Sequence, residues 1–199
     1  FGPSNNKGTL EPFAQAQIEE DVIQRLGCKR FVHGWLSTYA KGIERRAAEV
    51  KAGRFNAKDV DTDTRYGIGT TEYMRSVGGW SLTLECSQHD DVGGREVAYQ
   101  AIVNTLTFLG MIAGAPPQPA KDVEVLGLYD VFDRFDMNDQ FEKPWKSFDP
   151  IKRGECIGTR ADGSKILAER DCFIVFPNIK SQPGQEWFYL AHAGGRLGR

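Results

Sequence analysis

The chain has 199 residues, 40% of them hydrophobic and 26% charged, which is typical of a globular protein and unlike a disordered or fibrous one. Lys and Arg number 25 against 27 Asp and Glu, so a net charge of -2 leaves no basic field for a nucleic-acid backbone. The longest apolar run, 108–115, is far shorter than the roughly 20 residues of a membrane span. We therefore expect neither nucleic acid nor membrane as a partner.

The first half of the chain alternates signals for helices and strands. Apolar residues at four-residue spacing predict an amphipathic helix over 10–26, which Gly27 ends. A short strand is predicted within 28–35 and a second helix over 39–52. Turn residues and alternating acids then indicate an exposed loop over 53–69. This alternation is typical of an α/β layer.

A short helix, a strand and a long helix are expected between 70 and 112. Thr70 or Thr71 is suited to cap the short helix, which ends by Gly78 and Gly79. Residues 80–86 alternate and are rich in β-forming types, so they give the clearest strand signal of this half. The helix over 95–112 carries a wide apolar face, which we expect to pack on the sheet.

Three prolines within 116–119 indicate a linker, and we place a domain boundary there, giving domains 1–115 and 116–199. Beyond it, strands are predicted over 123–132, 154–159, 165–168, 172–176 and 186–192, with a turn at 161–163. Short strands at this density are typical of a small all-β domain or barrel. The predicted fold class is thus α/β followed by a small all-β, barrel-like domain.

Cysteine and histidine spacing gives no metal or disulfide signal. The four cysteines lie far apart without a CxxC pair, so a reducing, cytoplasmic location is the simpler expectation. His33, His89 and His192 begin no HxxE or HExxH pattern. A structural role is the default for each histidine. A functional role stays more open for His89 than for the other two, because His89 follows Glu85 closely.

Glu85 and Arg75 are the candidate functional residues of the first half. A carboxylate that ends an apolar strand faces the edge where α/β sheets bind ligands, and desolvation there would raise its pKa toward the range of an acid/base group. A salt bridge from Glu85 to Arg75 or Lys29, or simple exposure, is the structural alternative. Arg75 is placed to anchor a substrate carboxylate, against the alternative of a solvated helix arginine.

The segment 70–85, TTEYMRSVGGWSLTLE, resembles part of the succinylglutamate desuccinylase/aspartoacylase family, in which an Arg-Ser pair precedes a strand that ends in the catalytic glutamate. The second half resembles the family's C-terminal β-domain in its order of turns and strands. It shows FDPIKRGE at 148–155, ADG at 161–163, DCFIVFP at 171–177 and Pro183-Gly184. The likeness runs from about residue 10 to the end of the sequence.

This resemblance implies a zinc-carboxypeptidase-like α/β core, of which residues 1–115 would be the C-terminal part, with a β-domain beside the active site. It implies a zinc-dependent hydrolase that cleaves the amide of an N-acyl amino acid or a similar small acid. Glu85 would be the general acid/base and Arg75 would hold a substrate carboxylate. Tyr189 is the best match for an aromatic hydroxyl of the pocket, with Phe188 aligning almost as well. The partner would be a small acylated substrate. Whether the protein forms a homo-oligomer is not decided by the resemblance.

The sequence departs from the family in two ways. It contains neither the HxxE motif nor the Asp-x-His segment that hold the family's zinc, so we expect those ligands upstream of residue 1 and an inactive chain on its own. The family's glutamate is usually followed two residues later by glycine, whereas this chain has Ser87.

Two other functions are compatible with the residues. A non-catalytic binding module, or a degenerate family member, would explain the missing zinc ligands. A lipoyl- or biotinyl-like carrier would suit the small β-domain, although Lys165 is only an approximate match for a modifiable lysine at a hairpin tip.

Overall fold

A computed structural model describes residues 15–63, 69–87 and 90–194 of the chain. The chain forms two compact units. The first comprises Phe1–Trp35, Ile68–Leu126 and Gly194–Arg199, and the second comprises Leu36–Gly67 and Gly127–Ala193. The proline-rich linker therefore falls inside the first unit, and the second unit includes a helix that precedes this linker in the sequence.

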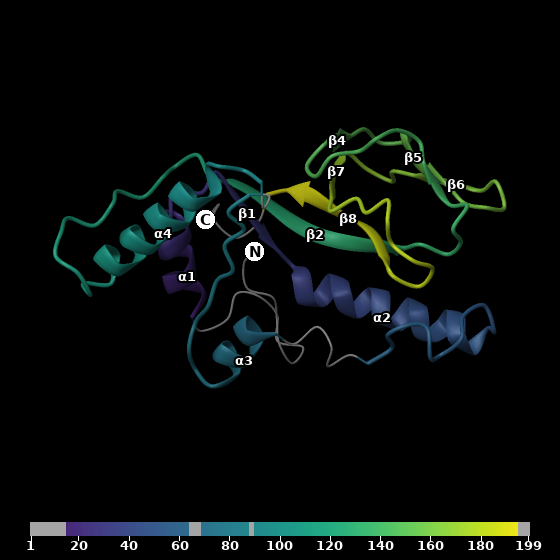
Figure 1. The fold of residues 1–199 in the computed structure, drawn as a ribbon, viewed down its shortest axis with the longest axis horizontal. Helices are drawn as coiled ribbons and strands as arrows, with labels where there is room; N and C mark the ends of the chain where they lie inside the picture. The colour runs from purple at the N-terminus through teal and green to yellow at the C-terminus, as the bar shows by residue number, and fades with distance from the viewer. Residues whose placement is uncertain (1–14, 64–68, 88–89, 195–199) are drawn as a thin grey trace. The chain divides into compact units, whose positions relative to one another are not determined.

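Three helices and a strand occupy the first unit: α1 (Ala16–Ile23), β1 (Arg30–His33), α3 (Thr70–Ser76) and α4 (Gly94–Phe108) (Figure 1). All four were predicted, α1 being shorter over the described residues. Gly69 stands at the N-cap of α3, and its N–H donates to the Glu72 carboxylate at 3.0 Å. The predicted threonine cap is therefore wrong, because an acid in the first turn takes the free N–H.

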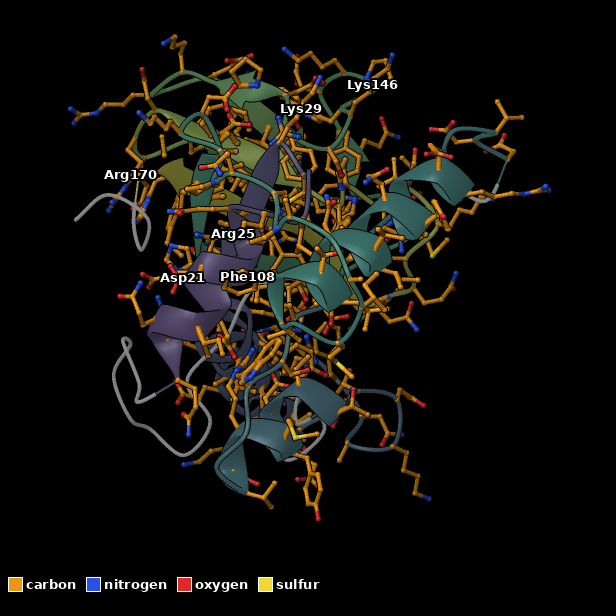
Figure 2. The ribbon with its side chains drawn as sticks, turned by 90° about the vertical axis from the view of Figure 1, so that its left-hand side faces the viewer. Asp21, Arg25, Lys29, Phe108, Lys146 and Arg170 are labelled. Carbon is orange, nitrogen blue, oxygen red and sulfur yellow. The ribbon has the colours of Figure 1, made fainter. Side chains whose placement is uncertain are left out.

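A cation–aromatic contact joins α1 to α4. The Arg25 guanidinium lies 4.5 Å from the centre of the Phe108 ring and donates to the Asp21 carbonyl oxygen at 2.6 Å. Figure 2 labels these three residues, which lie together where the two helices meet. The Asn104 side chain adds a hydrogen bond of 3.3 Å to the Leu26 carbonyl oxygen. Polar and cationic contacts therefore help to connect these helices.

Two expectations for the first unit are wrong. Residues 80–86 form no strand, because extended chain becomes a strand only when it pairs with a neighbour, and here side-chain hydrogen bonds hold the segment instead. The apolar face of α4 is covered only in part among the described residues: Ala101 is buried and Val103 and Leu106 are half-buried, whereas Val97 and Ile102 are 44% and 58% exposed.

The second unit holds the helix α2 (Trp35–Lys51, starting at the unit's edge) and most of the strands. The strands are β2 (Glu124–Asp133), β3 (Gln140–Phe141), β4 (Pro150–Ile151), β5 (Cys156–Thr159), β6 (Lys165–Leu167), β7 (Cys172–Val175) and β8 (Glu186–Ala193). The predicted strands of this half are confirmed, and the two-residue strands β3 and β4 are additions that are too short to show alternation.

The strands form two sheets, with orders β1-β2-β8-β7-β4 and β3-β5-β6. The pairs β4/β7, β7/β8, β3/β5 and β5/β6 are antiparallel, and Ile174 faces Leu190 across β7 and β8. Neither order closes on itself among the described residues, so the closure expected of a barrel is not shown in that part of the chain. The mixed α/β class is confirmed.

The core of the second unit is apolar and continuous. Trp187 and Phe188 of β8 stack with Phe141 and Phe132 respectively, at 4.4 and 4.8 Å between ring centres. Around them lie buried aliphatic residues, among them Ile151, Ile157, Ile174 and Leu190. Burial of such side chains contributes about 1.5–3 kcal/mol each, which makes this cluster the main source of the unit's stability.

The predicted turn at 161–163 joins β5 to β6, with Gly163 N–H donating to Arg160 O at 2.9 Å. Lys165 lies in β6 opposite Thr159 and not at the hairpin tip that a carrier domain requires. No helix within the described ranges combines the length and the apolar character needed to cross a membrane.

Candidate functional site

Arg75 is a buried, paired residue. It lies in the last turn of α3 with its side chain 4% exposed, and its Nε donates to Glu19 Oε1 at 2.9 Å. Its Nη2 donates to the Ser81 carbonyl oxygen at 2.8 Å, and Glu72 lies 3.6 Å from Nη1. The alternative of a solvated arginine is therefore wrong. A substrate carboxylate would have to compete with Glu19 for this guanidinium.

Glu19 connects α1, α3 and the segment that leads to Glu85. Its side chain is fully buried, and Oε1 accepts from both Arg75 Nε and the backbone N–H of Ser81, the latter at 3.0 Å. Ser81 is thus held through both its N–H and its carbonyl oxygen. A buried carboxylate is stable in such a position because its charge is compensated by a guanidinium and hydrogen bonds.

Glu85 lies four residues beyond this anchor and is exposed. Its carboxylate makes no hydrogen bond or ion pair with the described residues, so the predicted alternative of a salt bridge to Arg75 or Lys29 does not occur among them. The desolvated environment that we expected is also absent, because no strand carries Glu85 into the edge of a sheet. The side chain is free to meet a substrate or a second chemical group.

Ser87, two residues after Glu85, has a φ of 97°. Only glycine adopts this left-handed region readily, and other residues pay about 1–3 kcal/mol. The Ser87 hydroxyl donates to Asp91 Oδ2 at 2.6 Å, and this bond lowers the pKa of the Asp91 carboxyl. The backbone therefore takes a glycine conformation at the position where the resembled family has glycine.

The start of α4 is closely packed against the backbone of Cys86. A Cβ on Gly94, at the start of α4, would lie 2.8 Å from the Cys86 carbonyl oxygen. Gly94 therefore lets α4 approach the backbone next to Glu85. The predicted glycine pair 93–94 has a steric function here as well as opening the helix.

Tyr189 and Phe188 are adjacent in β8 and both buried, at 4% and 0% exposure. Phe188 belongs to the apolar core, whereas burial and the nearby Glu186 carboxylate raise the pKa of Tyr189, which Arg46 opposes. Successive residues of a strand point to opposite faces. Tyr189 is thus the polar-facing member of the pair, and it belongs to the second unit, whereas Arg75 and Glu85 belong to the first.

The polar group near Tyr189 is an ion cluster between α2 and the sheet, and Figure 1 shows α2 running along β2 and β8. Arg46 is 2% exposed, and its Nη2 donates to Asp133 at 3.1 Å and to Glu186 at 2.5 Å. Burial raises the pKa of Asp133, an effect that Arg46 opposes. Burial also raises the pKa of Tyr39 to about 12.

The sequence analysis did not identify this cluster. Arg46 follows Tyr39, Gly42 and Ile43 on the buried stripe of α2, and a charged residue on an apolar stripe is the signal that could have indicated it. Its Nε has no hydrogen-bond partner among the described residues, so the cluster satisfies the guanidinium only in part. The acids that complete it come from β2 and β8, about 90 and 140 residues later, and local patterns cannot indicate such partners.

Zinc does not fit the described residues. Within 15–63, 69–87 and 90–194, no group of three or more His, Cys, Asp or Glu side chains is arranged to hold a metal ion. His192 stacks on Tyr129 at 5.8 Å and His33 on Phe31 at 5.9 Å, so both rings take part in packing. His89 lies outside the described residues.

Two solved structures of succinylglutamate desuccinylases are similar to this chain. The one from Vibrio parahaemolyticus has a TM-score of 0.43 at 16% identity, covering 54% of this chain and 31% of its own. The one from Vibrio cholerae has a TM-score of 0.41 at 21% identity, covering 50% and 30% respectively. This chain thus spans less than a third of either protein, and these scores are below the level at which a shared fold or activity follows. No family model and no curated protein matches the sequence.

Proposed function

We propose that this chain is part of a zinc-dependent deacylase that hydrolyses the amide of an N-acyl amino acid or a similar small acid, with Glu85 as its proton-transfer group. The observation that carries the proposal is the exposed carboxylate of Glu85, which has no partner among the described residues. It follows a segment that Glu19 and Arg75 fix through Ser81. The resemblance of residues 70–85 to the family's glutamate segment supports it.

Proton transfer by Glu85 accounts for both halves of the reaction. The carboxylate takes a proton from the attacking water, whose oxygen forms a bond to the amide carbon. The protonated Glu85 then gives that proton to the amine nitrogen as the C–N bond breaks, and the carboxylate is restored. An exposed carboxylate with no fixed partner can make both transfers.

Ser87 supports the same assignment. Its left-handed backbone conformation marks a local constraint two residues from Glu85, and such constraints cluster at active sites. In this proposal, Arg75 is a positioning residue that acts through its hydrogen bond to Ser81. Tyr189 is a buried residue of the second unit and takes no part in the proton transfer. Because the described residues do not fit zinc, the metal would be held by residues outside them.

Substitution of Glu85 by Gln tests the proposal in an enzyme that includes this chain, with a panel of N-acyl amino acids as substrates. Loss of the proton-transfer group should lower kcat/KM by about 100- to 10,000-fold, while the zinc content stays unchanged. Asp122→Asn is the control, because Asp122 is an exposed acid of the same unit. Equal activity of the Glu85→Gln variant and the control would exclude this role.

A non-catalytic binding module is the second candidate. It is favoured by the internal pairing of Arg75 and by the absence of a metal-ligand group among the described residues. Metal analysis separates the two candidates, since stoichiometric zinc in the protein that includes this chain supports the deacylase. A metal-free protein that still binds N-acyl amino acids supports the module.

A further inference from the structure

The ion cluster around Arg46 brings two carboxylates to one nitrogen atom. Arg46 Nη2 donates to Asp133 Oδ1 at 3.1 Å and to Glu186 Oε1 at 2.5 Å. The acids come from β2 and β8 and the arginine comes from α2, so the cluster joins this helix to the sheet inside the second unit. We propose that Asp133 and Glu186 share one proton and that this proton fastens α2 to the sheet, so that α2 loosens when the proton leaves at higher pH.

One cation faces two anions in this cluster. The side chains of Arg46 and Asp133 are 2% and 3% exposed, and that of Glu186 is 29% exposed. Arg46 Nε has no hydrogen-bond partner in the described part of the chain, so the acids converge on Nη2 and do not divide the guanidinium donors between them. With both acids ionised, the second carboxylate is not balanced by Arg46. A proton removes this excess charge and the cost of burying it.

The other arginines near Asp133 are already paired with acids. Arg45, which also lies on α2, forms an ion pair with Asp130. Arg160, in the turn between β5 and β6, forms an ion pair with Asp139 and donates to the Asp133 carbonyl oxygen at 2.7 Å. Both arginines therefore help to hold this end of β2, but their charges are balanced by acids other than Asp133 and Glu186.

Two tyrosines and a third acid also face the cluster. The Tyr39 hydroxyl donates to Asp61 Oδ2 at 3.2 Å, and Arg46 Nη1 donates to the Asp61 carbonyl oxygen at 3.4 Å. Tyr189 of β8 is buried next to these groups, and burial raises the pKa of both tyrosines, which keeps them neutral. None of these three side chains is a cation, so the balance of charge still favours a bound proton.

Asp133 is the more buried of the two carboxyls that contact Arg46. Burial raises its pKa, the Arg46 guanidinium opposes this effect, and the Glu186 carboxylate adds to it, because like charges close together disfavour ionisation. A pKa that is higher in the folded chain than in the unfolded chain means that the proton stabilises the folded chain. This stabilisation is complete below the ordinary aspartate pKa of 3.8 and is lost as the pH rises through the folded-state pKa. It does not depend on the proposed deacylase activity, because no residue of this cluster transfers the proton in that reaction.

A pH titration of the full chain, followed through the ¹³Cγ NMR signal of Asp133, tests whether the proton is held. We expect a midpoint above 3.8, because both burial and the Glu186 carboxylate favour the protonated form. A midpoint at or below 3.8 would overturn the proposal.

Glu186→Gln tests whether the two acids share the proton. The variant keeps an oxygen that can accept from Arg46 Nη2 but removes the second negative charge, so the Asp133 midpoint should fall toward 3.8. Asp130→Asn is the matched control, because Asp130 lies three residues before Asp133 on β2 and so faces the other side of the strand. Its loss should leave the midpoint unchanged. If the midpoint in Glu186→Gln equals that of the unchanged chain, Asp133 titrates alone and the shared proton is refuted.

Asp133→Asn tests whether the proton fastens α2. Asparagine keeps an Oδ1 acceptor for Arg46 and has no carboxyl proton to lose. Relative to this variant, the folding equilibrium constant of the unchanged chain should fall by up to about tenfold per pH unit between 3.8 and the measured midpoint. Hydrogen exchange should show the accompanying loss of protection at the amides of α2 around Arg46. The same pH dependence in both chains, or a loss spread evenly over the second unit, would exclude the fastening role.

Discussion

The two units of this chain bury their residues in different ways. The second has a continuous apolar core, in which Ile174 and Phe188 are fully buried. In the first, the buried set includes the ion pair Glu19–Arg75, while Ile102 on its longest helix is 58% exposed. Dense apolar packing gives stability, and paired buried charges give a defined geometry at a cost in desolvation. The candidate residue Glu85 belongs to the first unit, where the buried pair Glu19–Arg75 holds the segment that precedes it.

Arg46 provides the strongest test of this contrast, because it introduces a buried charge into the apolar unit. Arg46→Ala leaves the Asp133 and Glu186 carboxylates without their cation and should lower the free energy of unfolding by about 3–5 kcal/mol. Denaturant unfolding measures the change. Arg45→Ala is the matched control on the same helix: its side chain is 47% exposed, and its loss should cost at most about 1 kcal/mol. Similar losses for the two variants would show that the buried cluster contributes no more to the free energy of unfolding than an exposed ion pair does.

Core truncation compares the two units directly. Ile174→Ala in the second unit should lower the free energy of unfolding by roughly 2–5 kcal/mol, because it creates a cavity at a fully buried position. Ile102→Ala in the first unit should change it by no more than about 0.5 kcal/mol, since the side chain is already mostly in water. Thermal and denaturant unfolding of both variants measure this difference. A large loss from Ile102→Ala would mean that another surface covers α4 in solution.

The smallest effect is expected next to the candidate site. Ser87→Gly and Ser87→Ala both lose the hydrogen bond to Asp91, but only glycine relieves the cost of the φ of 97°. The glycine variant should therefore have a free energy of unfolding about 1 kcal/mol higher than the alanine variant, as measured by denaturant unfolding. Equal stability of the two variants would show that the backbone conformation at Ser87 costs nothing.

Local patterns predicted most of the elements but not the conformation around Glu85. The alternation in 80–86 indicated a strand, yet no neighbour pairs with this segment among the described residues, and Glu19 and Arg75 hold it instead. The sequence shows that Ser87 stands where the resembled family has glycine, whereas the positive φ of Ser87 became visible only in the structure. Residues 1–14, 64–68, 88–89 and 195–199, with the start of the predicted first helix and His89, lie outside this comparison.

The sequence by itself determined the alternation of helices and strands, the order of the β-strands, and the choice of Glu85 and Arg75 as candidates, because each depends on neighbouring residues. Tertiary structure alone decided that Arg75 pairs with Glu19 and that Arg46 meets acids from two distant strands. The physical reason is that a charge or ring acquires its function from partners brought close by folding, and sequence spacing does not record those distances.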